Sequence, residues 1–209
     1  MQVYYMRVVE GSAIGFPQPR PHVLTIGEAR VPCAHMSDDD LWQLGQWRRV
    51  DAAAGYDPIW HIAIGGGSYD PESGMVTPAF EYRPLELIIE RRLADLALQR
   101  YKVEIAGIEL NDAVIRTDEG SQAKVNGAYA MVQLNPALVI DWKAASGWTQ
   151  LDAAAMTAIA AAVGAHVQAC YSAERAHGEA LEALASNEDI EGLIAYDITD
   201  GWPPTAGQE

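Results

Sequence analysis

Two histidines and a cysteine have a spacing at which helical side chains can bind a metal ion. His166 and His177 are eleven residues apart, about three helical turns, and Cys170 follows His166 by four residues. A zinc site would need further ligands from elsewhere in the chain, and the neighbouring sequence offers none. We therefore predict no metal site, and we expect these histidines to pack, partly buried, in a seam between helices.

The other candidates for chemistry have simpler structural explanations. Asp38, Asp39 and Asp40 follow Ser37, lack the glycine spacing of a calcium loop and suit the first turn of a capped helix. The glycines at 65–67 lack the lysine of a phosphate-binding loop, and no Gly-x-Ser-x-Gly nucleophile motif occurs. None of the 29 acidic residues forms a carboxylate pair that its surroundings single out for glycoside hydrolysis. The sequence predicts a protein that is not an enzyme, with no catalytic residues and no cofactor.

Three tryptophans are more informative than the titratable residues. Trp142 and Trp148 flank an expected turn at 146–147 on two paired strands, where they could lie on one face of the hairpin. Two interpretations stay open: the pair packs beneath a long helix as core, or it forms an exposed aromatic surface for a partner. Trp202 lies in a tail with few other apolar residues, and we assign it to an intersubunit contact.

The residues at 152–185 keep a helical period for longer than any other segment. Asp152 is the expected N-cap, and the alanines that follow it favour a helix. An unbroken helix of this length would reach roughly 50 Å, so it would pack along a partner chain or carry a small domain on its side. We expect the part up to Ala173 to pack on the Trp142 hairpin and the part up to Ala185 to face another chain. The apolar stripe consists of Met156, Ile159, Val163, Val167, Cys170, Leu181 and Leu184, of which we assign Val163, Val167, Leu181 and Leu184 to interaction.

Composition limits the classes of partner. The 209 residues carry 14 Lys+Arg against 29 Asp+Glu, a net charge of −15, which argues against direct binding to nucleic acid. We find no run of about twenty apolar residues that could span a bilayer and no signal peptide, so we expect no membrane insertion. Cys33 and Cys170 lie far apart in the sequence and are expected to be buried and unpaired.

The pattern of elements predicts an α+β protein with a β-rich N-terminal domain at 1–83. Strands are expected at the N-terminus and at 13–16, followed by an extended, proline-rich arm at 17–32 with one short strand near 22–25. A capped helix is expected at 38–44, a strand at 46–50 and a turn at 51–56. Two further strands, at 60–64 and 75–82, would enclose a loop at the glycines 65–67.

After this domain the pattern becomes mostly helical. A connector helix is expected at 84–101, followed by a C-terminal domain at 102–209 of short antiparallel strands packed on helices, including the long Ala-rich one. Residues 101–105 alternate like a strand, and Thr117-Asp118 caps a helix in which Val125, Ala128, Tyr129 and Val132 share one face. A helical turn at 190–194 and a terminal strand at 195–198 complete the expected order.

Several motifs in the second half of the chain resemble a known family. They are Thr117-Asp-Glu-Gly-Ser-Gln-Ala, Gly127-Ala-Tyr, Asp141-Trp-Lys-Ala-Ala-Ser-Gly-Trp, Leu151-Asp-Ala-Ala and Ala165-His-Val-Gln-Ala-Cys. Their order over roughly 85–203 resembles a domain of bacteriophage and prophage tail proteins, which is usually carried at the C-terminal end and has no assigned activity. The N-terminal half is similar, more weakly, to the upstream halves of tail fibre and tail-fibre-assembly proteins.

This resemblance implies a place in the virion tail, after synthesis in the host cytoplasm, and a non-enzymatic structural or accessory role at the tail tip, fibre or baseplate. Its partners would be other phage tail proteins and further copies of the chain, with a trimer expected first because of the symmetry of fibres. The alternative is a tail fibre assembly chaperone that binds the fibre tip. A third hypothesis is attachment to a host surface receptor through the N-terminal loops.

Overall fold

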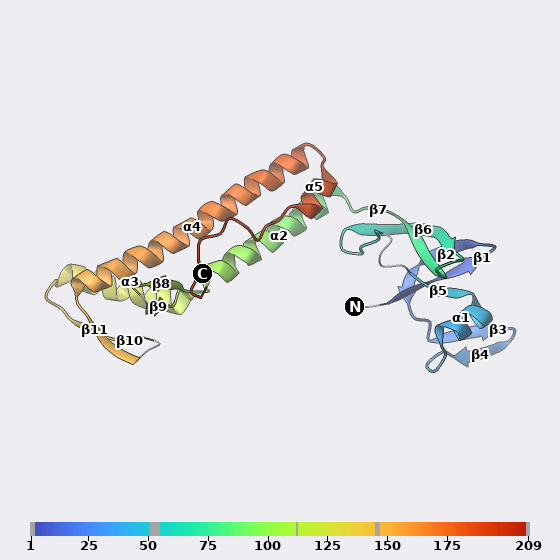
Figure 1. Ribbon diagram of the computed structural model, residues 1–209, viewed down its shortest axis with the longest axis horizontal. Coiled ribbons are helices and arrows are strands. Elements are labelled where there is room, and N and C mark those ends of the chain that lie inside the picture. Colours follow the sequence, from blue (N-terminus) through green and yellow to red (C-terminus); the bar gives the residue numbers. More distant parts are fainter. Residues whose placement is uncertain (1–2, 51–54, 112, 145–146, 208–209) are drawn as a thin grey trace. The chain divides into compact units, whose positions relative to one another are not determined.

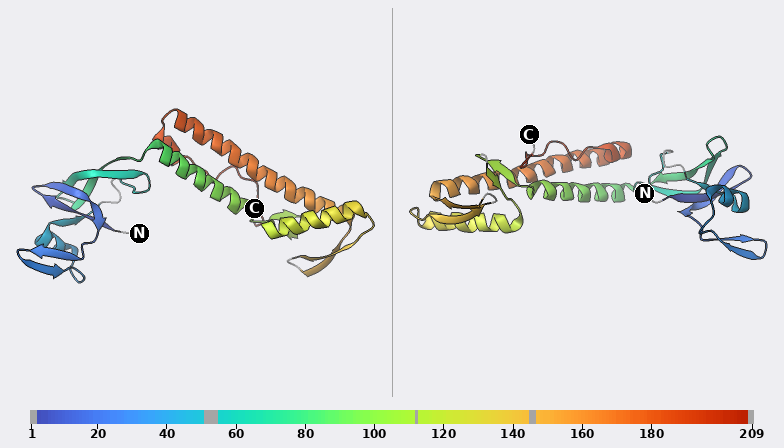
Figure 2. Two further views of the ribbon diagram at one scale, coloured as in Figure 1. Left: turned by 180° about the vertical axis from the view of Figure 1, so that it is seen from behind. Right: turned by 60° about the horizontal axis from the view of Figure 1, so that its bottom comes forward.

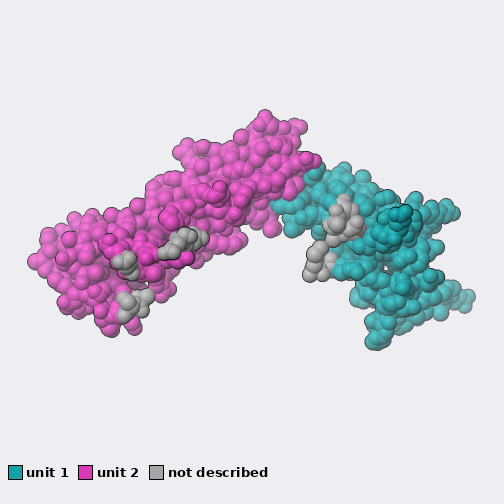
Figure 3. All heavy atoms as spheres, viewed as in Figure 1, with its two compact units in different colours: residues 1–85 teal, residues 86–209 magenta. Residues whose placement is uncertain are grey.

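The computed structural model describes residues 3–50, 55–111, 113–144 and 147–207. The chain forms two compact units, Met1–Leu85 (unit 1) and Glu86–Glu209 (unit 2), which Figure 3 colours separately. Unit 1 is rich in antiparallel strands, whereas unit 2 consists of helices and short two-stranded ribbons. The predicted α+β class is confirmed.

Unit 1 is built on a five-stranded antiparallel sheet with the order β5-β1-β2-β6-β7 (Figure 1). Its strands are β1 (Tyr4–Val9), β2 (Ser12–Pro19), β5 (Trp47–Arg49), β6 (His61–Asp70) and β7 (Met75–Tyr82). One core cluster comprises Met6, Val8, Ala13 and Val76. A second cluster includes Tyr5, Leu24 and Leu41, which come from three different elements.

The proline-rich segment of unit 1 contains a complete hairpin rather than one strand in an extended arm. β3 (Val23–Ile26) pairs with β4 (Ala29–Pro32), so the prediction missed the second strand. Helix α1 (Asp38–Gly45) follows with the predicted capping box, in which the Ser37 side chain accepts from Asp40 N–H and the Asp40 carboxylate accepts from Ser37. Of the turn predicted at 51–56, residues 51–54 lie outside the described part of the chain.

The predicted loop at glycines 65–67 is wrong, because these residues belong to strand β6. The register of β6 against β7 shifts between Ala63 and Gly67, so the glycines form an irregularity within the strand. A Cβ atom at Gly67 would lie 2.3 Å from the carbonyl oxygen of Thr77, which explains why glycine is needed there. The chain reverses direction later, at 71–74.

In its described residues, unit 2 contains the long helices α2 and α4, the shorter helices α3 and α5, and two small ribbons (Figures 1 and 2). Residues 101–104 continue helix α2, so the strand predicted at 101–105 is wrong, and α2 is packed into unit 2. The elements are α2 (Leu85–Glu104), β8 (Ile108–Leu110), β9 (Ala113–Ile115), α3 (Glu119–Leu134), β10 (Ile140–Ala144), β11 (Gly147–Leu151), α4 (Ala153–Ser186) and α5 (Ile190–Ala195).

The core of unit 2 lies where α3 packs on the first half of α4. Val125 and Val132 of α3 meet Met156, Ile159 and Val163 of α4 in one buried cluster. The Asp152 side chain caps α4 as predicted, accepting from Ala155 N–H at 2.8 Å. Of the four residues predicted to share one face of α3, Val125, Ala128 and Val132 are buried, and Tyr129, at the edge of this face, is 36% exposed.

A polar network joins α2, α3 and α4. Glu104, at the end of α2, forms an ion pair with Arg100, which also bonds Glu174 of α4 at 3.2 Å. Gln122 of α3 donates to Glu104 Oε1 at 3.2 Å. Thr117, fully buried before α3, donates to the Glu104 carbonyl and accepts from Gly107 N–H at 2.9 Å. The three helices are therefore held together by buried hydrogen bonds as well as by apolar packing.

The C-terminal tail, residues 196–207, runs back from α5 beside α2 and α4 (Figures 1 and 2). It forms no strand at 196–198, so the predicted terminal strand is wrong. Arg92 of α2 donates to the Tyr196 carbonyl at its start, and Ala206 N–H donates to the Gly107 carbonyl at 3.0 Å near its end. The tail thus covers part of the α2 and α4 surface.

The expectation that no segment is long and apolar enough to span a bilayer is wrong for helix α4. By length and composition alone it meets that criterion, with a mean hydropathy of 1.4 over its most apolar 18 residues. Many of these residues are alanines, and the larger ones, Met156, Ile159 and Val163, are packed against α3. The core helix of a folded domain meets the same criterion, although only 28% of this window is buried within the chain.

Candidate binding site

The β10–β11 hairpin separates its two tryptophans onto opposite faces. Cross-strand partners share a face of a ribbon, and Trp142 pairs with Thr149 whereas Lys143 pairs with Trp148. The prediction that both tryptophans share one face is therefore wrong, because they sit at positions of opposite parity in the register. Trp142 is half-buried against the core of unit 2, and Trp148 is 74% exposed. Trp142 thus packs as part of the core, whereas Trp148 is exposed on the other face.

Trp142 lines a hollow of about 330 Å³ in the surface of unit 2. Its inner wall is aliphatic, with Ile115 from β9, Val125 from α3, Leu151 from β11 and Ile159 from α4. The hydroxyls of Ser121 and Thr149 add polar groups to the lining. Ser121 is positioned by the Asp118 N-cap of α3, and Thr149 by its pairing with Trp142 in the hairpin. The site therefore combines an apolar interior with few polar groups, as ligand pockets usually do.

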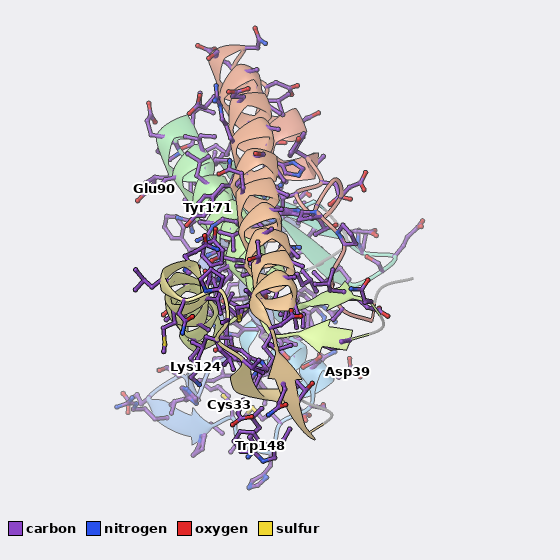
Figure 4. All side chains as sticks on the ribbon, turned by 90° about the vertical axis from the view of Figure 1, so that its left-hand side faces the viewer. Cys33, Asp39, Glu90, Lys124, Trp148 and Tyr171 are labelled. Carbon is purple, nitrogen blue, oxygen red and sulfur yellow. The ribbon has the colours of Figure 1, made fainter. Side chains whose placement is uncertain are left out.

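Three cationic side chains border this hollow, which we name the basic pocket. Arg116 follows β9, Lys124 lies on the second turn of α3, and Lys143 lies on β10. A second, more open hollow of about 450 Å³ is lined by the same three residues with Trp142 and Ala144. Neither lining includes a described aspartate or glutamate, although acids outnumber bases two to one in the chain. Figure 4 labels Lys124 on α3 and Trp148 on the hairpin.

The charges of the basic pocket are only partly neutralised. Arg116 pairs with Asp118 at 3.1 Å, but its side chain is 75% exposed. Hydrogen bonds from Ser121, with help from the charge of Arg116, lower the pKa of Asp118, so this carboxylate is ionised at neutral pH. Lys143 lies 5.8 Å from the ring of Trp148, and Lys124 has no ion pair within the described residues. An anionic ligand beside Trp142 would therefore meet Lys124 and the partly neutralised Arg116, whereas Lys143 borders the hollow from the hairpin face that carries Trp148.

The α4 residues assigned to interaction are mostly used within the chain. Val163 is 5% exposed in the core with α3, and Leu181 is fully buried in the part of α4 on which α5 packs. Val167 and Leu184 are half-buried. The stripe predicted from the sequence is thus the inner face of α4, and α5 of the same chain packs on the helix as well.

The histidines of α4 make structural hydrogen bonds. His166 is buried, as expected, and its Nε2 lies 3.1 Å from the Val103 carbonyl of α2, so Nε2 carries the proton and donates. Cys170 Sγ lies 3.7 Å from the same nitrogen, and burial together with the charge of Glu104 raises the pKa of this thiol to about 11. Both cysteines are free and buried, as predicted. In the described part of the chain, no three potential ligands gather at a metal site.

Trp202 is engaged within the tail rather than fully exposed. Its ring stacks on His177 with a centroid distance of 5.5 Å, and its Nε1 donates to the Ile198 carbonyl at 2.8 Å. His177 Nε2 donates to the Asp200 carbonyl, and its Nδ1 lies 2.9 Å from the Tyr196 hydroxyl. His177 and Trp202 together fasten the tail to α4.

None of the three cations of the basic pocket was predicted from the sequence. They belong to three elements that are brought together only by the packing of β9, α3 and the hairpin. One signal was available: the chain contains only three lysines, and two of them, Lys124 and Lys143, lie within twenty residues of each other. Such a concentration is unusual in a chain with a net charge of −15.

Comparison with known proteins gives one match. The model of a family described as a domain of unknown function (DUF4376) matches residues 88–200, which include most of α2, all of α3 to α5 and the described lining of the basic pocket. No curated protein and no solved structure shows significant similarity to the chain. The match covers more than half of the 209 residues, and the chain therefore belongs to the DUF4376 family.

Proposed function

We propose that this protein is a non-enzymatic structural or accessory component of a bacteriophage tail, at the tail tip or fibre. It would act through protein–protein contacts in virion assembly, and host attachment would be a secondary role. The observation that carries the proposal is the exposed Trp148, beside Lys143, on a hairpin within the motifs that resemble phage tail proteins. An exposed tryptophan beside an exposed cation is typical of the centre of a binding surface.

Exposed apolar residues on α2 support association with further copies of the chain. Leu87, Leu98 and Tyr101 are 48%, 53% and 41% exposed. Their spacing places them within about 60° of one another around the helix, at roughly 100° per residue. A stripe of this kind is buried when helices associate in a symmetric oligomer, and a trimer agrees with the symmetry of tail fibres.

Mass spectrometry of purified virions tests the proposal. A structural component is expected at a fixed stoichiometry with other tail proteins. Absence from virions, with the protein bound to fibre in the lysate, would refute the structural role and favour the assembly chaperone. Light scattering tests the oligomer separately: the wild type should exceed the monomer mass, and Leu87→Glu/Leu98→Glu should return it to the monomer. A monomeric wild type would exclude the homo-oligomer.

A further inference from the structure

We infer that the basic pocket binds an acidic, extended peptide segment of a partner protein, with one apolar side chain inserted against Trp142. The inference rests on the proposed function only in taking that partner to be another tail protein. The pocket lies within unit 2 and needs no contribution from unit 1.

The charges around the pocket select an anionic segment. Lys124 and Lys143 are exposed, and Arg116 keeps most of its surface in solvent despite its pairing with Asp118. A long polyanion such as nucleic acid would be repelled by the net charge of −15. A short segment with a few carboxylates is attracted by the nearby cations instead. The more distant acidic residues of the chain repel it little, because salt screens charges beyond about 8 Å at physiological ionic strength.

The interior of the pocket selects an apolar side chain. Its walls are formed by Ile115, Val125, Leu151 and Ile159 around the half-buried Trp142. A sugar placed there would bury hydroxyl groups, for which Ser121 and Thr149 are the only side-chain hydroxyls among the described residues of the lining. Because an unpaired buried hydroxyl costs about 1–3 kcal/mol, this wall disfavours a saccharide and suits an aliphatic group.

Strand β9 gives the reason why the segment is extended. Three successive residues, Ala113, Val114 and Ile115, border the pocket. Side chains of a strand alternate between its faces, so a hollow that meets three successive residues meets the edge of the strand. One edge of β9 is paired with β8, and the ribbon has no third strand within the described residues. An extended peptide can therefore add to the other edge through backbone hydrogen bonds.

A fluorescein-labelled peptide, Asp-Glu-Leu-Asp-Glu with blocked ends, tests the inference by fluorescence anisotropy with the full-length protein. We expect saturable binding that weakens at 0.5 M salt. Replacing the acids by Asn and Gln, or the Leu by Ser, should each weaken binding about tenfold. No saturable binding, or equal binding of the neutral peptide, would overturn the inference. Displacement of the peptide by glucuronate or inorganic phosphate at equal concentration would also overturn it, in favour of a small-anion site.

The third lysine of the chain provides a matched control. Lys124→Glu/Lys143→Glu should weaken peptide binding at least tenfold, whereas Lys102→Glu, a charge reversal at another exposed lysine, on α2, should leave it within twofold. Circular dichroism should be unchanged in both variants. In the wild type, the peptide should protect Lys124 and Lys143 from acetylation but leave Lys102 reactive. Equal effects at all three lysines would refute the location.

The two proposals fail separately. If the protein binds the peptide but is absent from virions, the assignment of the pocket stands and the structural tail role is refuted. If the protein is present in virions but binds no acidic peptide, the tail role stands and the proposed occupant of the pocket is refuted.

Discussion

The side chain of Thr117 joins the end of α2 to the segment before β8 and to the start of α3 through two hydrogen bonds. Its hydroxyl donates to the Glu104 carbonyl at the end of α2 and accepts from Gly107 N–H at 2.9 Å, and Thr117, Glu104 and Gly107 are all buried. Thr117→Val keeps the shape of the side chain but leaves a carbonyl and an N–H without partners. Each buried group left unpaired costs about 1–3 kcal/mol, so we expect a loss of about 4 kcal/mol.

Thr117→Ser is the matched control, because it keeps both hydrogen bonds and removes one methyl group. Loss of a buried methyl costs about 1 kcal/mol. The two variants should therefore differ by about 3 kcal/mol, or about 12 °C in Tm for a domain the size of unit 2. If packing alone decided stability, Thr117→Val would be the more stable variant, because valine keeps the shape of threonine. We expect the opposite order, with Thr117→Ser more stable than Thr117→Val.

Urea unfolding followed by circular dichroism at 222 nm provides the assay, since α2, α3 and α4 all belong to unit 2. The two units need not unfold together, so the helical signal must be fitted as its own transition. If Thr117→Val were as stable as Thr117→Ser, the buried hydrogen bonds would contribute nothing beyond packing. The reasoning about this junction would then be refuted.

Three further predictions follow from single side chains. Val163→Asp should destabilise unit 2 by at least about 3 kcal/mol in urea, because it places a carboxylate in the core; a normally folded variant of lower oligomer mass would contradict this. Cys170 should react with iodoacetamide at pH 8 about 100-fold more slowly than a thiol with the ordinary pKa of 9.0, because thiolate forms only as pH approaches about 11; equal rates by mass spectrometry would contradict this. Trp202→Ala should detach the tail from α4 and speed amide hydrogen exchange at 198–206, while α3 stays protected. Unchanged exchange in the tail would show that Trp202 does not hold the tail on α4.

Local signals in the sequence were sufficient for most helix boundaries. Ser37 and Asp40 form a capping box, and Asp118 and Asp152 cap α3 and α4, because a cap requires only residues within one turn of each other. The apolar period of α4 likewise identified its inner face, since Met156, Ile159 and Cys170 are buried. These features could be predicted because their causes lie close together in the chain.

Where local patterns were ambiguous, tertiary packing decided. Residues 101–104 alternate like a strand, but Val103 and Glu104 are buried as the last turn of α2, and the Val103 carbonyl bonds His166 of α4. The glycines at 65–67 read as a loop, but the close approach of β7 makes them part of β6. In both places a contact from a distant segment overrode the local preference.

The sequence by itself determined the α+β class, the long capped helix and its apolar stripe, because these follow from period and propensity. Only the tertiary structure decided what that stripe touches: Val163 and Leu181 are covered by the same chain, not by a partner. The basic pocket likewise exists only after β9, α3 and the hairpin pack together. No spacing along the chain encodes the meeting of Arg116, Lys124 and Lys143, since their proximity depends on the packing of separate elements.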